Sequence, residues 1–404
     1  MVLKRFKSLT EGLPPTYWLL WTGTLVNRLG GFVIPFLTLY LTSQREIPVS
    51  QAALMVSLFG AGSFIAQLTG GELTDRLGRR PVMLTSFLVA PVMMVTLGFA
   101  RAIPLIAVAT FAVGFFTDLY RPAVGAAIAD LVPTESRTRA YGYNYWAINL
   151  GAAIAPVIAG LLANYTYLAL FIGDALTTFV FGLIVYFGIR ETRPVEAQNV
   201  KGATLQERFT QLKREPILLL FSFLALFFGI IYMQGFVTLP VDMGSYGLGP
   251  EQYGLAIAIN GFLIVLVSIP ISNIAGNWPR FEAMAASAVF LGLGFGFGAL
   301  ANTFPLYAIS VVIWTLGEIA ASAVAPAIIA DLAPVKLRGL YQGIFGSAWG
   351  LSFFVGPLLG GWVYEHLGAN VLWGGCLGLG LVLTLGYLFM SAPAKRRMAK
   401  SSTI

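Results

Sequence analysis

The sequence predicts an all-helical membrane protein with twelve transmembrane helices arranged as two halves of six. Three observations support this fold class. Hydrophobic residues make up 57% of the 404-residue chain and charged residues only 11%, whereas soluble domains carry about 25% charged residues. The apolar residues form long continuous runs, and parts of the first half of the chain recur in the second. This composition excludes a soluble globular domain and a disordered chain, because neither accommodates so much apolar surface.

The apolar runs are long enough to cross a bilayer as helices, which requires about 20 residues each. They lack the alternating pattern of a transmembrane β-barrel strand. The twelve predicted spans are residues 16–42, 51–71, 81–100, 103–131, 140–163, 167–189, 216–240, 252–275, 282–301, 305–331, 340–363 and 370–391. The first run is not followed by a small-residue cleavage site, so we interpret it as a retained helix.

The distribution of basic residues predicts the orientation of the spans. With the N-terminus in the cytoplasm, nearly all of the 25 Lys and Arg residues fall in cytoplasmic segments. Only Arg45 and Arg101 lie outside, and Arg28 and Arg121 lie within spans. This bias follows the positive-inside rule and predicts a multi-pass protein of the cell membrane with both termini cytoplasmic. It also accounts for the net charge of +7 without a nucleic-acid partner.

A sequence repeat predicts how the spans are divided. The segment Ala129–Pro133 (ADLVP) recurs as Ala330–Pro334 (ADLAP), and the same spacing relates Pro156 to Pro357. We therefore predict an N-terminal six-helix half (1–189), a cytoplasmic connector (190–215) and a C-terminal half with a basic tail (216–404). Parallel repeats of six helices are typical of transporters whose halves move about a site at the membrane midplane.

The scarcity of reactive side chains argues against an enzyme. The chain has one cysteine, Cys376, and one histidine, His366, so it offers neither a nucleophile–His pair nor a Cys or His metal cluster. It contains no phosphate-binding glycine loop and no zinc-protease motif. We expect no metal, no cofactor and no catalytic residue, with a proton gradient as the energy source.

The segment Gly71–Arg80 reads GELTDRLGRR and lies between the second and third spans. It resembles the loop motif between helices 2 and 3 of the major facilitator superfamily, and the resemblance of the chain extends over nearly its whole length. It implies the fold of that family and a monomer. It also implies a conformational latch on the cytoplasmic side, made by Gly71, Asp75, Arg76, Gly78 and Arg79.

Further segments resemble motifs of the same family. Arg121–Gly125 is similar to its helix-4 motif, with Val124 in place of glutamine. Gly356–Gly361 (GPLLGG) has the full form of the antiporter motif, whereas the helix-5 version, Ala155–Gly160, has alanine at two glycine positions. Two stretches resemble LmrP-type multidrug antiporters; they are Asn144–Leu150 and Thr315–Ile319. The resemblance implies drug:proton antiport.

Glu318 is the leading candidate for proton coupling. It falls in the middle of the tenth predicted span among apolar neighbours, with no basic residue within a helical turn. Ionisable residues inside a membrane are expensive and mark functional sites by default. A carboxylic acid in such surroundings favours its protonated form and can exchange a proton. The alternative is a neutral glutamic acid in a structural hydrogen bond.

Asp118 is a second candidate for proton coupling. It lies three residues before Arg121 in the fourth span, so the two side chains share a helix face. We predict a charge cluster of Arg28, Asp118 and Arg121, in which the two cations keep Asp118 ionised. The alternative is a static ion pair that joins the first and fourth helices.

Polar and aromatic residues on the helices that line the cavity in the family complete the predicted substrate site. They are Asn27, Arg28, Arg121, Tyr143, Asn144, Tyr232, Gln234, Trp314 and Trp349. Aromatic rings with few fixed hydrogen-bonding groups suit lipophilic molecules, cations included.

These features together predict a secondary transporter. The leading hypothesis is proton-coupled export of lipophilic small molecules by alternating access. The alternatives are a proton-coupled symporter of a small solute, and a flippase or exporter of an amphipathic anionic lipid, for which Arg28 and Arg121 would suit the head group.

Overall fold

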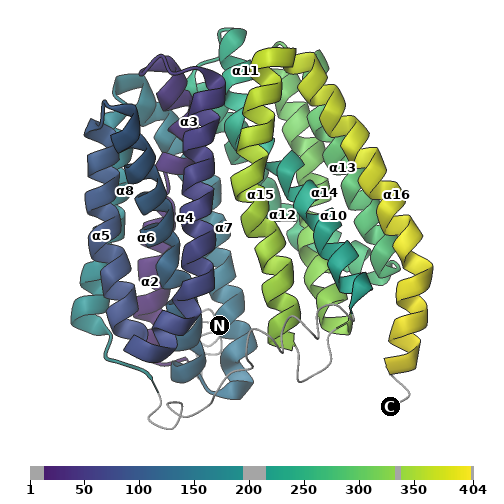
Figure 1. Ribbon diagram of the computed structural model, residues 1–404. Coiled ribbons are helices and arrows are strands. Elements are labelled where there is room, and N and C mark those ends of the chain that lie inside the picture. The colour runs from purple at the N-terminus through teal and green to yellow at the C-terminus, as the bar shows by residue number, and fades with distance from the viewer. Residues whose placement is uncertain (1–12, 194–214, 333–337, 402–404) are drawn as a thin grey trace, which may run out of the picture. The chain divides into compact units, whose positions relative to one another are not determined.

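The computed structural model describes residues 13–193, 215–332 and 338–401, and every regular element in these ranges is helical (Figure 1). Most of the predicted connector lies outside the described residues. Within them, twelve segments are long and apolar enough to cross a membrane, which confirms the predicted fold class and number of spans. The orientation of the termini stays a prediction.

The helices fall into two parts of the chain, on either side of residues 189–215. Those of the first part of the chain are α2 (Pro15–Leu29), α3 (Val33–Ser43), α4 (Val49–Leu77), α5 (Arg79–Phe99), α6 (Ile103–Leu131), α7 (Thr134–Tyr165) and α8 (Leu168–Gly188). Those of the second part are α10 (Pro216–Val237), α11 (Leu239–Ser245), α12 (Pro250–Asn277), α13 (Arg280–Phe297), α14 (Phe304–Leu332), α15 (Arg338–Leu367) and α16 (Ala369–Ser401), with the 3-10 turn η2 (Gly298–Leu300). The pairs α2–α3 and α10–α11 each form one span.

Proline and glycine set several of the helix boundaries. Helices α2, α10 and α12 each begin at a proline, whose fixed φ suits the first helical turn, where its missing N–H is not needed. Gly78 separates α4 from α5 with φ of 104°, a conformation that glycine adopts without steric cost. The apolar runs therefore determine the helices, and these residues determine where they end.

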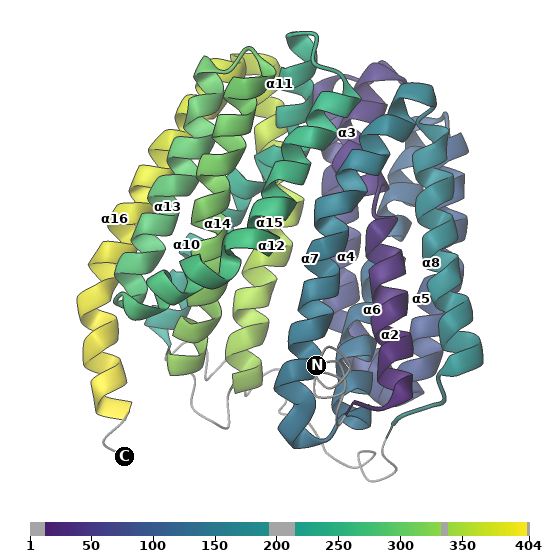
Figure 2. The same cartoon turned by 180° about the vertical axis from the view of Figure 1, so that it is seen from behind.

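Both parts of the chain use the same helix pairings. Helix α2 packs against α7 and α8, as α10 packs against α15 and α16. Helix α5 packs against α6 and α8, as α13 packs against α14 and α16, and these neighbours run side by side in both views (Figures 1 and 2). The repeat in sequence thus corresponds to a repeat in packing.

The chain forms two compact units by contact. Unit 1 comprises Met1–Val33 and Gly62–Val200, and unit 2 comprises Ile34–Ala61 and Lys201–Ile404. Unit 2 therefore includes α3 and the first part of α4. In that unit Thr38 donates a hydrogen bond to the carbonyl of Phe236 at 3.4 Å. The break between α2 and α3 allows the two helices of the first span to pack in different units. The predicted division into residues 1–189, 190–215 and 216–404 stays a prediction.

Candidate functional site

The carboxylate of Glu318 lies at the meeting point of three helices in unit 2. Tyr232, on α10, donates its hydroxyl to Oε1 at 3.0 Å, and Asn260, on α12, donates Nδ2 to Oε2 at 2.5 Å. Asn260 also reaches the hydroxyl of Thr315 at 3.1 Å. In the described part of the chain no Lys or Arg nitrogen comes within 4.0 Å of this half-buried carboxylate. Only neutral donors hold it, as its apolar sequence neighbours predict.

Aromatic rings surround this carboxylate. The ring of Tyr232 meets the rings of Trp314 and Trp349 edge to face, at centroid distances of 5.8 and 6.0 Å. Trp314 is completely buried and stacks on Phe295 of α13 at 5.3 Å. Such pairs hold the tyrosine hydroxyl in place. Tyr232 and Trp349 are only half buried, so they are better placed for a substrate than Trp314, whose ring is enclosed by protein.

Gln234 does not fit the substrate-binding role that we predicted for it. Its amide nitrogen, Nε2, donates to the carbonyl groups of Ile230 and Gly356 at 2.8 and 3.0 Å. Its amide oxygen, Oε1, accepts a hydrogen bond from the hydroxyl of Thr238 at 3.2 Å. The side chain is 1% exposed. Gln234 therefore joins α10 to α15, because a buried amide in a helix interface must satisfy its hydrogen bonds there.

Arg28 lies near the end of α2, where that helix contacts α6 and α7. Its Nη2 donates to the hydroxyl of Tyr120 on α6 at 3.1 Å. Tyr120 in turn donates to Asn27 at 3.2 Å, and Asn27 donates to Thr178 at 2.8 Å. The predicted ligand residue Asn27 is therefore engaged inside unit 1. Gly151 brings α7 close, since a Cβ there would lie 2.7 Å from the carbonyl carbon of Arg28.

The predicted charge cluster is only partly formed. Asp118 Oδ1 pairs with Arg121 Nε at 2.7 Å, one helical turn away. The other oxygen, Oδ2, accepts a hydrogen bond from Ser63 of α4. The carboxylate is buried, whereas the Arg121 side chain is 47% exposed. Arg28 is not within ion-pair distance of Asp118, so the pair is local to α6. It corresponds neither to the three-residue cluster nor to an ion pair that joins the first and fourth spans.

Arg28 and Arg121 nevertheless meet at one cavity of about 320 Å³ within unit 1. Asn144 of α7, a third residue predicted to bind substrate, lies on the same cavity. Its wall consists of Thr24, Arg28, Tyr120, Arg121, Val124, Gly125, Ile128, Tyr141, Asn144 and Ile148. Tyr143 is not part of this wall; its ring lies 5.9 Å from that of Trp18 and its carbonyl accepts from Trp21 at 2.9 Å.

Asp174 of α8 occupies the break between α2 and α3. One oxygen of its buried carboxylate accepts the backbone N–H groups of Phe32 and Val33 at 3.2 and 3.1 Å. These are donors at the beginning of α3, where the helix dipole favours a negative group. Asp174 thus satisfies backbone groups that the break would otherwise leave unpaired.

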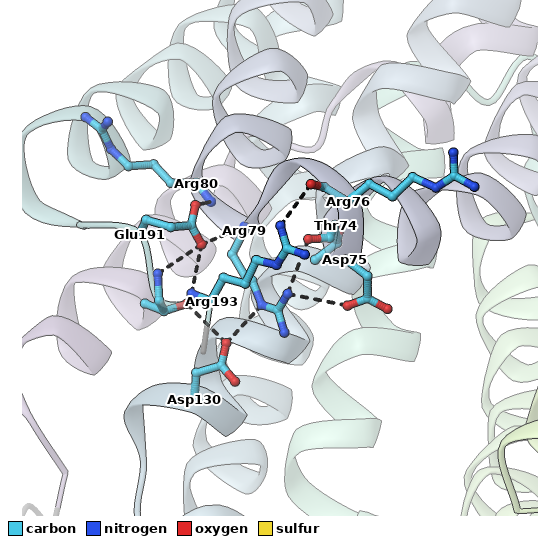
Figure 3. A network of polar contacts seen from close by, with 9 residues as sticks. Thr74, Asp75, Arg76, Arg79, Arg80, Asp130, Glu191 and Arg193 are labelled. Atoms are coloured by element: carbon cyan, nitrogen blue, oxygen red, sulfur yellow. Dashed lines mark hydrogen bonds and ion pairs between the residues drawn. The ribbon is translucent and has the colours of Figure 1, made fainter. Parts of the chain in front are cut away.

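The predicted latch residues form a network at one end of unit 1 (Figure 3). Arg79, whose side chain is 8% exposed, binds Asp130 of α6 at 2.9 Å and the carbonyl of Thr74 at 3.2 Å. Asp75, the acid of the motif, lies 3.4 Å from Arg79, with its side chain 76% exposed. The main ionic partner of Arg79 is therefore Asp130, which the motif does not contain.

Glu191 completes this network from the segment after α8. It accepts the backbone N–H groups of Arg79, Arg80, Thr192 and Arg193 at 2.9 to 3.0 Å (Figure 3). Burial alone would raise the pKa of Glu191, but these four donors outweigh it and hold the pKa below its ordinary value. A carboxylate that accepts several backbone N–H groups is stabilised in its charged form.

The three remaining predicted latch residues, Arg76, Gly71 and Gly78, lie in the same region. Arg76 pairs with Glu72 at 2.5 Å, and both side chains are largely exposed. Arg193 donates to the carbonyl of Arg76 at 2.9 Å. A Cβ at Gly71 would meet no atom of the described residues within 4 Å, whereas one at Gly78 would meet the carboxylate of Glu191.

Sequence reasoning missed several partners of the ionisable groups, three of them neutral and one a carboxylate. Asn260, Ser63, Tyr120 and Asp130 bind Glu318, Asp118, Arg28 and Arg79 respectively. One signal was available for Asn260, because it is a lone amide in a strongly apolar stretch of its span. Serine and tyrosine are too common in membrane helices for their identity to mark a partner.

Comparison with known proteins places this architecture in one family. The family model of the Major Facilitator Superfamily matches residues 20–249 and 236–403. The transporter YttB of Bacillus subtilis is 26% identical, over 89% of this chain and 91% of its own. A Na(+), Li(+), K(+)/H(+) antiporter of Planococcus maritimus is 23% identical, over 84% and 89%. The multidrug resistance protein MdtH of Escherichia coli O157:H7 is also 23% identical, over 95% and 96%.

A solved transporter structure has the same fold. The crystal structure of the nucleoside transporter NupG (D323A mutant) superposes with a TM-score of 0.80 over 93% of this chain and 99% of that one, at 14% identity. The matched segments together span most of the described helices. The chain therefore belongs to the major facilitator superfamily, as a multi-pass transporter of the plasma membrane and not an enzyme.

Proposed function

We propose that this transporter is a proton-coupled antiporter that exports lipophilic small molecules by alternating access. One observation carries the proposal: the carboxylate of Glu318 lies within a membrane span and is held by Tyr232 and Asn260 alone among the described residues. Two of the relatives, an ion/H(+) antiporter and a multidrug resistance protein, support the same type of transport.

The geometry suits reversible proton binding. When Glu318 is ionised, the hydroxyl of Tyr232 and the amide N–H of Asn260 donate to its two oxygens. When it is protonated, its own O–H can donate to the tyrosine oxygen, so neither state requires an ion pair to break. Because a ligand shifts a conformational equilibrium only by its different affinity for the two states, proton binding here can bias the transport cycle.

Asp118 is the second proton-coupling residue in this proposal, with a more restricted role. Its carboxylate pairs with Arg121 and accepts a hydrogen bond from Ser63, so a proton that binds there must compete with an ion pair. Protonation of Asp118 would release the half-exposed Arg121. The proposed order is therefore exchange at Glu318 first, with Asp118 responding only when Arg121 gains another partner.

In this proposal Tyr232 and Trp349 are candidate substrate contacts within unit 2. Arg28, Arg121 and Asn144 are separate candidates, which share a cavity within unit 1. A cationic substrate is not part of the proposal, because the wall of that cavity contains two guanidinium groups and no carboxylate. The same observation favours, as the second candidate, an exporter of an amphipathic anionic lipid.

The test uses purified protein in proteoliposomes with a pH-sensitive dye inside. Lipophilic compounds, naphthoate and the uncharged naphthamide among them, are added under an imposed proton gradient. We expect substrate-dependent proton movement opposite to substrate flux in the wild type and its loss in Glu318→Gln. The matched control is Glu251→Gln, which removes an exposed acid at the beginning of α12. A Glu318→Gln protein that exchanges protons at the wild-type rate would refute the proposal.

A further inference from the structure

The cavity of unit 1 has an electrostatic character that proton exchange at Glu318 does not explain. Its wall brings together two cations, Arg28 from α2 and Arg121 from α6, and no acidic residue. Asp118 and Asp174 are the nearest carboxylates that act on Arg28, and both lie outside the wall. Asp118 is already paired with Arg121, and Asp174 is bound to backbone N–H groups. The cavity is therefore lined by the two guanidinium groups and not by these two carboxylates.

Arg28 has hydrogen-bonding capacity that the described residues leave unused. Its Nη2 binds Tyr120, but its buried Nε has no hydrogen-bond partner among the described residues. No carboxylate of the described residues lies within 4.0 Å of its guanidinium group. A buried donor left unpaired is destabilising, and more so when it is charged. An anionic ligand in the cavity would remove this cost.

Two neutral groups of the wall are also unsatisfied. The Thr24 hydroxyl and the Asn144 amide oxygen are buried and have no hydrogen-bond partner among the described residues. Of the two, only the Thr24 hydroxyl can donate to an anion, because an amide oxygen only accepts hydrogen bonds. Thr24 precedes Arg28 by one helical turn, so both side chains lie on the same face of α2. A hydroxyl and a guanidinium N–H on one face are the donors that a compact oxyanion requires.

The rest of the wall is apolar. Val124 and Ile128 of α6 and Ile148 of α7 line the cavity beside the polar groups. A volume of about 320 Å³ is at the small end of the range for ligand pockets. It suits a small molecule, or the polar end of a larger one, that combines an oxyanion with an apolar body.

We propose that this cavity binds the oxyanion group, a carboxylate or phosphate, of an amphipathic substrate through Arg28, Thr24 and Arg121. The inference rests on the proposed transport function and deepens it, because it assigns a charge to the substrate. Arg28 provides the primary contact. Arg121 provides the second, and a ligand oxygen there competes with Asp118 for its guanidinium group. The oxyanion belongs either to a soluble organic anion or to a lipid head group.

The test measures binding directly and needs no proton gradient. Purified protein is titrated with naphthoate and with naphthamide, its uncharged analogue of the same shape, and tryptophan fluorescence is recorded. We expect the wild type to bind naphthoate about tenfold more tightly than naphthamide, as one charge-assisted hydrogen bond would provide. Arg28→Gln removes this preference, and Thr24→Val reduces it.

The matched control is Arg101→Gln, which removes an exposed arginine outside the cavity and keeps the wild-type preference. Arg28→Lys keeps the charge and is expected to keep part of the preference if Arg28→Gln does not fold. Equal affinity of the wild type for naphthoate and naphthamide would overturn the inference, whatever the variants do. So would an unchanged preference in a folded Arg28→Gln protein.

A competition arm identifies the source of the oxyanion. Phosphatidate in lipid nanodiscs would displace naphthoate from the wild type if the ligand is a lipid head group, and would leave it bound if the ligand is a soluble anion. Because this assay is independent of proton movement, failure of anion binding would leave proton-driven export intact. Failure of export would likewise leave the binding result intact.

Discussion

Replacement of Asp242 by alanine is expected to destabilise unit 2 strongly. Asp242 is 2% exposed in α11, at the end of the seventh span. Its Oδ2 accepts hydrogen bonds from Tyr307 of α14 at 2.8 Å and Trp373 of α16 at 3.0 Å, and Oδ1 accepts one from Tyr364 of α15 at 3.3 Å. One carboxylate thus joins the ends of four helices.

The expected magnitude follows from these three donors. Hydrogen bonds between side chains in membrane proteins contribute about 0.6 kcal/mol on average and up to about 1.7 kcal/mol. Tyr307 and Trp373 are almost completely buried, so after the substitution water cannot replace the carboxylate as their hydrogen-bond acceptor. We therefore assign the upper free energy to each of these two hydrogen bonds. Tyr364 is half buried, so we assign the average free energy to its hydrogen bond. The loss for Asp242→Ala is therefore about 4 kcal/mol, and about half of that for Asp242→Asn, which keeps one acceptor oxygen.

The assay is thermal unfolding of the purified protein in detergent, followed by intrinsic fluorescence. For a unit of 150–250 residues, about 1 kcal/mol corresponds to 2–4 °C, so Asp242→Ala is expected to lower the midpoint by roughly 8–16 °C. Glu251→Gln, on the same unit but exposed, is the control and should leave it unchanged. A decrease of less than about 2 °C for Asp242→Ala would refute this account of the four-helix junction.

Three further predictions concern unit 1. Gly151→Leu is expected to force α7 away from α2 and lower stability by about 1–3 kcal/mol, and an unchanged unfolding midpoint would contradict the close approach seen here. Asp130→Asn should lower the free energy of unfolding by about 2–3 kcal/mol, and Asp75→Asn by less than about 1 kcal/mol. The reason is that Arg79 pairs with Asp130 in a buried position and with Asp75 at the surface. Equal losses of unfolding free energy in urea would disprove this ranking. Glu191→Gln should destabilise the protein most near neutral pH. Because the native pKa of Glu191 is lowered, its contribution is present above the unfolded value of about 4.5 and is lost as the pH falls through the native value. The difference between the unfolding midpoints of the two proteins should therefore stay constant from about pH 7 to about pH 4.5 and shrink below about pH 4.5. A difference that stays constant down to about pH 3 would contradict the role of the four N–H donors.

The sequence by itself determined the number of spans and the ionisable residues within them. Both depend on local free energies: about 20 apolar residues cross the bilayer wherever they occur, and a charge inside a span is costly in any context. For this reason Glu318, Asp118 and Arg28 could be singled out, and the repeat of residues 129–133 at 330–334 anticipated the matching helix pairings.

Only the tertiary structure decided what these residues bind. The partner of each charge comes from a helix far away in the chain, as Asn260 does for Glu318 and Tyr120 for Arg28. A polar residue in an apolar helix does not reveal which neighbour it faces, so Gln234 was predicted to bind substrate although its amide joins α10 to α15. The unused donor of Arg28 in a cavity without a carboxylate was equally invisible in sequence. Side-chain direction depends on how the helices pack, and packing is a property of the whole chain rather than of any one segment.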